Sequence, residues 1–314
     1  ELRFTRCVFG VTSSPFHLMA TFRHYLSKYS DDSLDVVQEI LKSMYVDDMV
    51  SGADSVKEAC HLYLEARRML REGGFNLRKF ATNSKQLNTL VSTSIGNNEF
   101  SGDTSTTMSY SEVTQPSIER PQGGLESKVL GVLWSREDDK LVFRFNTFLA
   151  IAKTIPFTRR GLLQLIARLY DPLGLLSPIL VPLKCAFQKA CKENIAWDCQ
   201  LPQEISDVVR FWLRDLTRLD RMEFPRYCFS FDKSSLKSVH LIGFSDASEA
   251  AFAGVFYVRV ESDSGVSVNL FASRSRVAPM KPQSVPRLEL LGCLVLANLS
   301  EHVKSSIVSV TTLS

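Results

Sequence analysis

The sequence predicts an α+β protein built from two or three domains. Its 314 residues are enough for several cores. Near residue 47, two adjacent aspartates interrupt an apolar strand pattern, and after residue 239 three alternating segments precede an amphipathic helix pattern. Helix patterns fill much of the sequence between them. We therefore expect a strand-and-helix unit near each end of the chain and a helical stretch between the two.

The composition is typical of a globular protein and excludes several classes. The chain is 45% hydrophobic and 23% charged, and its net charge of +3 means that any nucleic-acid affinity must come from local basic patches. Its seven cysteines form no Cys-x-x-Cys pair, which argues against a zinc site or a disulfide framework and fits a reducing compartment. No apolar run approaches 18 residues and no signal peptide is visible, so we expect an intracellular protein that is not secreted and does not contact a membrane.

The first element with chemical promise is the hairpin pattern around Asp47 and Asp48. Apolar segments 41–46 and 49–50 flank the pair. Neighbouring side chains on a strand point to opposite faces, so two consecutive aspartates serve one site only where a turn bends the backbone. Two such carboxylates repel each other unless a hard cation binds, which suggests Mg²⁺ or Mn²⁺ and two-metal phosphoryl transfer. The alternative is an ordinary surface turn.

The elements around this hairpin are predicted from local signals. Pro15 is expected to open a helix that runs to about Tyr25, and a second helix, 32–42, leads into the hairpin. The capping box that starts at Ser55 and an apolar stripe predict a helix from residue 56 to 70, ended by two glycines. Segment 75–80 alternates like a strand.

The hairpin also carries a family resemblance. Tyr45-Val46-Asp47-Asp48 resembles the Tyr-x-Asp-Asp box of reverse transcriptases, and with the following Met-Val-Ser-Gly it resembles the polymerase of Pao/BEL-type LTR retrotransposons. The resemblance implies an RNA-directed DNA polymerase in which Asp47 and Asp48 are catalytic metal ligands. The preceding Phe-Gly-x-Thr-Ser-Ser-Pro is similar to the segment that supports the nascent base pair. The nucleotide-binding residues implied in this way are Phe9, Gly10, Ser14, Tyr45 and Lys79.

The middle of the chain begins with a segment of small and polar residues, 92–127, which we expect to be a flexible insertion. Segments 128–134 and 140–145 are then predicted to form a hairpin through a turn at Asp138 and Asp139, so this second Asp-Asp pair is interpreted as a turn and not as a metal site. The Leu130-Gly131 pair resembles the primer-grip element of reverse transcriptases, which implies contact with the primer.

Three helices are predicted between residues 158 and 219. In segment 153–192, seven basic residues stand against the single acid Asp171. Such a stretch can be a solvated face, or it can follow the phosphates of a duplex. Arg-Arg-Gly at 159–161 and Tyr-Asp-Pro-Leu-Gly at 170–174 look like the region after the palm in Pao-type polyproteins. The template and primer contacts implied here are Arg159, Arg160 and Arg168.

The last segment predicts three antiparallel strands, at 239–244, 253–260 and 268–272, followed by a helix from 286 to about 303 and a fourth strand at 307–311. This order resembles ribonuclease H. Asp246 matches its first catalytic, metal-binding carboxylate and Glu289 its second. The third would follow Ser314, and the palm would take another aspartate from before Glu1. We therefore expect both sites to be incomplete in this chain alone, with little or no activity.

The predicted organisation is a partial reverse-transcriptase palm, a flexible insertion, a primer-grip-like hairpin, a helical thumb and connection, and a truncated ribonuclease H-like α/β domain. Their ranges are 1–91, 92–127, 128–150, 151–225 and 226–314. The partners implied are an RNA template, a DNA primer, an RNA–DNA hybrid, dNTPs and the remainder of the polyprotein, in a cytoplasmic virus-like particle.

Two other functions stay open. The first is a non-catalytic, nucleic-acid-binding relic of such an element. The second is an aspartic peptidase, because this region of Pao-type polyproteins is also labelled a peptidase family. That chemistry needs Asp-Thr/Ser-Gly around a carboxylate dyad. The nearest approach, Asp246-Ala247-Ser248, lacks the glycine, and Ser51-Gly52 has no adjacent aspartate, so the sequence disfavours a peptidase.

Overall fold

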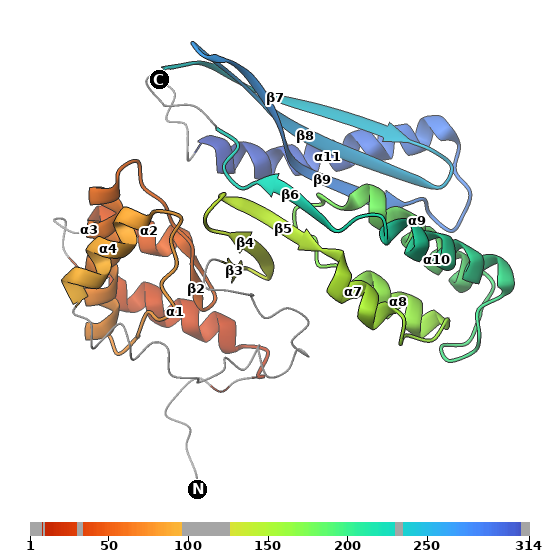
Figure 1. Ribbon diagram of the computed structural model, residues 1–314, viewed down its shortest axis with the longest axis horizontal. Helices are drawn as coiled ribbons and strands as arrows, with labels where there is room; N and C mark the ends of the chain where they lie inside the picture. Colours follow the sequence, from red (N-terminus) through yellow and green to blue (C-terminus); the bar gives the residue numbers. More distant parts are fainter. Residues whose placement is uncertain (1–7, 9, 30–33, 96–125, 230–234, 309–314) are drawn as a thin grey trace, which may run out of the picture. The chain divides into compact units, whose positions relative to one another are not determined.

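The computed structural model describes residues 8, 10–29, 34–95, 126–229 and 235–308 (Figure 1). The chain divides into two compact units. Unit 1 comprises residues 1–116 and 136–138, and unit 2 comprises 117–135 and 139–314. Both contain helices and strands, which confirms the mixed class predicted from the sequence. Within the described ranges, no helix combines the length and apolar character needed to cross a membrane.

The described part of unit 1 packs four helices with a small hairpin. Its elements are α1 (Ser14–Leu26), α2 (Leu34–Ser43), β1 (Met44–Tyr45), β2 (Asp48–Met49), α3 (Val56–Glu72) and α4 (Lys85–Ile95). Leu26, Ile40 and Leu70 are fully buried in the core that α1, α2 and α3 share. The helix expected from Pro15 is confirmed as α1, and the capping box at Ser55 is present, with the Ser55 hydroxyl accepting from the Glu58 amide at 3.2 Å.

Two predictions for unit 1 are wrong. Segment 75–80 forms no strand. Lys79 has a left-handed backbone with φ of +57°, which breaks the extended conformation that the alternating pattern suggested. The insertion expected from residue 92 also starts too early, because α4 continues to Ile95 and buries Leu87 and Val91. Residues 96–125 of that insertion lie outside the described residues.

Unit 2 contains a four-stranded antiparallel sheet with helices that follow it in the chain. The sheet joins β3 (Glu126–Val129), β4 (Val132–Ser135), β5 (Lys140–Arg144) and β6 (Arg221–Pro225) in that order. The helices are α7 (Phe145–Ala152), α8 (Arg159–Arg168), α9 (Ser177–Lys192) and α10 (Gln203–Leu216). Phe145, Leu162, Leu183 and Ile205, one from each helix, are almost fully buried in one continuous core.

The sequence divided this sheet incorrectly. The predicted strand 128–134 is instead a hairpin of β3 and β4. Leu130 and Gly131 both have positive φ and form the turn that reverses the chain between the two strands. Glu126 and Ser127, assigned to the insertion, belong to β3. The turn at Asp138 and Asp139 is confirmed.

The rest of unit 2 is a three-stranded antiparallel sheet with one long helix across it (Figure 1). The strands are β7 (Leu236–Ala247), β8 (Ala251–Ser262) and β9 (Gly265–Val277), and the helix is α11 (Val285–Val308). This order confirms the predicted strands and helix. The fourth strand, expected from residue 307, is wrong at its start, because residues 307 and 308 continue α11. No glycine or proline interrupts residues 293–308. Residues 309–314 lie outside the described part.

Alternate residues in the first half of β8 are buried against α11. Phe256 lies in a cluster with Leu299 and Val303 of the helix. A Cβ added to Gly254 would lie only 2.9 Å from the Leu296 Cα, so a glycine is needed where the helix approaches the strand closely. This packing fixes the turns of α11 that lie next to the end of β7.

Candidate functional site

The aspartate pair lies at the tip of the β1–β2 hairpin. Met44 pairs with Met49 and Tyr45 pairs with Asp48, so Val46 and Asp47 form a two-residue turn. Val46 has φ of +56°, an outlier for a β-branched residue, and strain of this kind costs about 1–3 kcal/mol. Both aspartates and Tyr45 are exposed. The hairpin therefore presents two adjacent carboxylates on a strained turn, as the sequence predicted.

The electrostatics of this tip are unfavourable for two negative charges. Partial burial and then the negative charge of Asp47 raise the pKa of Asp48 above its usual range, while the positive charge of Lys79 lowers it. The structure thus brings Lys79 into electrostatic reach of the pair. Two oxygen-bearing groups that repel each other and are open to solvent fit the donor set that Mg²⁺ or Mn²⁺ prefers.

The turn before α1 holds the other predicted nucleotide contacts. Gly10 is exposed with φ of +82°, a conformation that glycine adopts without strain. The Ser14 hydroxyl donates a hydrogen bond to the carbonyl of Val8 and so stabilises the turn. Phe9, the third residue predicted in this segment, lies outside the described residues.

Leu130 and Gly131 occupy the β3–β4 turn of unit 2. Gly131 lies against Tyr170, since an added Cβ would be 2.8 Å from the Tyr170 Cε1 atom. Leu130 is 38% exposed at this turn. The predicted primer-grip pair is therefore a tight turn whose glycine suits its φ of +86° and lies against the exposed ring of Tyr170.

Arg159 and Arg160, at the start of α8, both bind the segment that precedes α10. The Arg159 guanidinium lies 4.2 Å from the ring centroid of Trp197 and donates to the carbonyl of Ile195 at 3.0 Å. Arg160 makes two hydrogen bonds with Asp198, at 2.7 and 3.1 Å. The sequence suggested that these arginines face phosphates, but the structure gives each a partner within the chain.

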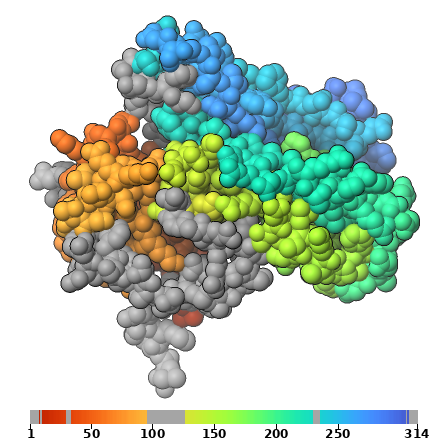
Figure 2. All heavy atoms as spheres, viewed as in Figure 1, coloured from red at the N-terminus to blue at the C-terminus, as the bar shows by residue number. Residues whose placement is uncertain are grey.

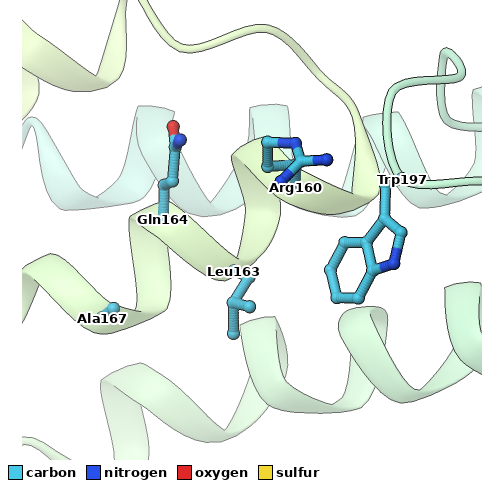
Figure 3. A pocket seen from close by; sticks show the side chains of 5 residues that line it. All are labelled: Arg160, Leu163, Gln164, Ala167 and Trp197. Carbon is cyan, nitrogen blue, oxygen red and sulfur yellow. The ribbon is translucent and has the colours of Figure 1, made fainter.

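A shallow hollow runs along the outer side of α8 beside Arg160 (Figure 3). Its lining residues come from α8 and from the loop that carries Trp197 (Figure 3): Arg160, Leu163, Gln164, Ala167 and Trp197. Trp197 and Leu163 are each 41% exposed. The hollow therefore combines an apolar floor with one paired arginine.

The basic excess of segment 153–192 is smaller in the structure than in the sequence count. Asp198 neutralises Arg160, and Glu204 forms an ion pair with Lys189 at 2.5 Å. Both acids follow the segment in the chain, so a count within the segment missed them. Arg168 is half-buried at the end of α8, and no ion pair to it is present among the described residues.

Asp246 and Glu289 lie on neighbouring elements. A Cβ added to Gly292 of α11 would be 3.2 Å from the carbonyl oxygen of Asp246, and Glu289 precedes Gly292 by about one helical turn. Ser245 contacts Cys293 of α11, with 3.4 Å between oxygen and sulfur. Because side chains alternate along a strand, Asp246 points to the sheet face opposite α11.

Both carboxylates are exposed. Within the described ranges, no three His, Cys, Asp or Glu side chains are placed to bind one metal ion.

The second Asp-Asp pair has a structural role. Asp139 accepts a hydrogen bond from Trp134 Nε1 at 2.9 Å and two from the Arg226 guanidinium at 2.6 and 2.8 Å. Since Trp134 is in β4 and Arg226 follows β6, this carboxylate ties the sheet together. The interpretation of residues 138 and 139 as a turn is confirmed, and the sequence did not identify these partners.

Comparison with known proteins supplies one family match. Residues 158–313 match the model of the Pao retrotransposon-like RNaseH-like domain. No curated protein matches the chain. One solved structure, a foamy viral protease-reverse transcriptase in complex with an RNA/DNA hybrid, is 17% identical, with a TM-score of 0.46; the likeness covers 97% of this chain and 32% of that one. The matched residues contain α8–α10, β7–β9 and α11, and through them the chain belongs to the Pao retrotransposon family as a fragment of its polyprotein.

Proposed function

We propose that this chain is part of a reverse transcriptase with an attached ribonuclease H. The polymerase adds dNTPs to a DNA primer on an RNA template, and the nuclease cleaves the RNA strand of the resulting hybrid. The observation that carries the polymerase assignment is the β1–β2 hairpin, where the strained Val46 turn presents Asp47 and Asp48 beside Lys79. The family match supports the nuclease assignment.

In the polymerase site, Asp47 and Asp48 would hold Mg²⁺ or Mn²⁺ together with a further carboxylate from elsewhere in the polyprotein. The ions would neutralise charge on the reacting phosphates and lower the pKa of the primer 3′-hydroxyl. Lys79 would attract the triphosphate of the incoming nucleotide, and Tyr45 would also contact that nucleotide. Gly10 and Ser14 would support the templating base from the turn before α1.

In the nuclease site, Asp246 and Glu289 would contribute two of the carboxylates that hold divalent ions. Because Asp246 points away from α11, the two side chains would have to meet around the outer edge of β7, the first strand in the order β7-β8-β9. Selection of RNA would rest on contacts with its 2′-hydroxyls, which DNA lacks. Leu130 and Gly131 would contact the primer, and basic residues of the helical stretch, Arg168 among them, would follow the duplex phosphates. A protein with this chemistry would act together with the rest of its polyprotein and its template, in a virus-like particle.

Primer extension tests the polymerase assignment. A longer polyprotein segment that contains this chain is incubated with an RNA template, a DNA primer, dNTPs and Mg²⁺. We expect this segment to extend the primer and its Asp47→Asn/Asp48→Asn variant not to. The control variant Asp139→Asn changes an acid of the second, structural pair and should keep polymerase activity when folded.

The nuclease assay uses the same proteins on an RNA–DNA hybrid. Asp246→Asn should abolish RNA cleavage and leave extension intact, whereas Asp47→Asn should do the reverse. Loss of both activities from either single change would contradict two separate sites. No extension by a well-folded wild-type segment that still binds the hybrid would favour a non-catalytic, nucleic-acid-binding relic.

A further inference from the structure

Glu39 of α2 contacts both stems of the hairpin that carries the aspartate pair. Its Oε1 atom accepts a hydrogen bond from the Ser51 hydroxyl at 2.5 Å and lies 2.7 Å from the Ser43 hydroxyl, whose single proton is shared between this oxygen and the backbone carbonyl of Glu39 at 2.6 Å. Ser43 directly precedes β1, and Ser51 follows β2 by two residues. One carboxylate oxygen therefore connects the two chain segments that enter and leave the hairpin.

The same level of the hairpin is closed by the backbone. The amide of Val50 donates to the carbonyl of Ser43 at 3.0 Å. Beyond this bond the hairpin has only two residue pairs, Met44 with Met49 and Tyr45 with Asp48. Such a short ladder is only marginally stable by itself, so its geometry depends on contacts at its base.

The tip of the hairpin opposes this closure in two ways. Val46 is strained, and strained backbone persists only where the surrounding structure holds it in place. The carboxylates of Asp47 and Asp48 are adjacent in the chain, and they repel each other when both are charged. The buried side chains of Ile40 and Met44 anchor α2 and β1 in the core, which makes Glu39 a fixed point for the segment that leaves the turn.

We propose that Glu39 is a positioning residue that holds Asp47 and Asp48 at the separation at which they bind a divalent cation. The inference rests on the proposed function, because it assigns the hairpin to metal binding. Glu39 acts through Ser43 and Ser51 and does not itself touch the metal. Its function needs a hydrogen-bond acceptor and does not need a negative charge, so glutamine should replace it while alanine should not.

The test uses the whole chain and two measurements. Hydrogen exchange at the Val50 amide reports closure of the hairpin, and Mn²⁺ titration followed by electron paramagnetic resonance reports binding at the aspartates. We expect Glu39→Ala and Ser51→Ala each to speed Val50 exchange and to weaken Mn²⁺ binding by about fivefold, the effect of losing one ordinary hydrogen bond. Glu39→Gln should stay within about twofold of wild type.

Gln38→Ala is the matched control, because Gln38 is an exposed neighbour on the same helix. It should change neither measurement. Unchanged Val50 exchange in both Glu39→Ala and Ser51→Ala would overturn the proposal that Glu39 holds the two stems of the hairpin together. Faster exchange with unchanged Mn²⁺ affinity would overturn its role in metal positioning.

The Asp47→Asn/Asp48→Asn variant separates this inference from the proposed function. If that variant binds Mn²⁺ as tightly as wild type, the hairpin is not the metal site and the proposed function fails. The Val50 exchange rates of the Glu39 and Ser51 variants still decide whether Glu39 holds the two stems of the hairpin together.

Discussion

The hydroxyl of Ser273 donates a hydrogen bond to the carbonyl of Gly174 at 2.5 Å. Its amide also donates to the carbonyl of Leu173 at 2.8 Å. Ser273 lies in β9, and Gly174 lies in the turn before α9, so these bonds join the three-stranded sheet to the helical stretch. The family match at 158–313 spans both sides of this contact, which is consistent with one folding unit containing the helices and the sheet.

Gly174→Ala should strongly destabilise unit 2. Gly174 has φ of +73°, and an added Cβ would lie 1.9 Å from the Ser273 carbonyl oxygen, so the β9 backbone would have to move. We expect a loss of about 3 kcal/mol or more in the free energy of unfolding. Chemical denaturation followed by tryptophan fluorescence measures it, since all three tryptophans, Trp134, Trp197 and Trp212, are in unit 2.

Gly131→Ala is the control for this prediction. Its φ of +86° imposes a similar backbone strain, but the added Cβ would meet only the side chain of Tyr170, which is 54% exposed and free to shift. A loss of about 1 kcal/mol is expected. Equal losses in the two variants would show that the contact with Ser273 contributes nothing beyond strain.

Asp139→Asn should lower stability without affecting divalent metal binding. The change weakens the charge-assisted hydrogen bonds to Arg226 and leaves part of that guanidinium unpaired beside Trp134. A partly buried, bidentate pair of this kind contributes about 1–3 kcal/mol. Thermal denaturation should show the loss, and Mn²⁺ titration should match wild type. Reduced Mn²⁺ binding in the folded variant would mean that the second aspartate pair is a metal site after all.

Local signals in the sequence predicted the elements whose determinants lie within a few residues. Ser55 and Glu58 cap α3 through mutual hydrogen bonds, so their spacing alone was sufficient. The alternation in β8 was visible because every second residue is buried. The Asp47–Asp48 turn was predictable because apolar residues flank it on both sides.

Determinants distant in sequence were missed. Strand β6 forms by pairing with β5, for example Phe143 with Met222, and its five residues carry too short a pattern to be distinguished alone. The partner of Arg160 is Asp198, which lies in another loop. Glu39 carries no motif, and its contact with Ser51 depends on how α2 meets the hairpin. Alternating hydrophobicity in 75–80 predicted a strand that the left-handed backbone of Lys79 prevents.

Asp48→Asn should stabilise unit 1 at neutral pH. Burial and Asp47 raise the pKa of Asp48 in the folded protein. A carboxyl with a raised folded-state pKa favours the folded state at low pH, and that contribution is lost as the pH rises through this pKa. The free energy of unfolding of the variant should therefore exceed that of wild type once the pH rises above the ordinary pKa range of a carboxyl group. Because Asp48 is exposed, we expect only a few tenths of a kcal/mol.

Circular dichroism melts of the two proteins between pH 3 and about pH 7 would measure this difference. Mg²⁺ should reduce the gain, since a bound cation removes the repulsion in the wild type only. A variant that becomes less stable than wild type as the pH rises would show that attraction to Lys79 outweighs burial and the charge of Asp47.

Asp198→Ala should increase the affinity of the chain for an RNA–DNA hybrid if α8 follows the phosphates. Removal of this carboxylate frees the Arg160 guanidinium, which is exposed at the hollow beside Trp197 (Figure 3). Figure 2 shows the yellow-green atoms of the segment that contains α7 and α8 at the surface. One additional phosphate contact steepens the dependence of log affinity on log salt concentration by about 0.9. Fluorescence anisotropy with a labelled hybrid at several salt concentrations would detect both changes. The stability cost should be below about 1 kcal/mol, because both partners are exposed.

Asp207→Ala provides the matched control, since it changes the net charge equally and breaks the pair of Asp207 with Arg210 on α10. We expect a smaller gain in affinity from this control, without the steeper salt dependence. In the double variant Arg160→Ala/Asp198→Ala, the steeper dependence of log affinity on log salt concentration should disappear. This variant lacks the Arg160 guanidinium, although its loop still lacks the charge of Asp198. If Asp198→Ala and Asp207→Ala behave alike, Arg160 does not face the nucleic acid, and the basic residues of α8 serve the fold through Ile195, Trp197 and Asp198.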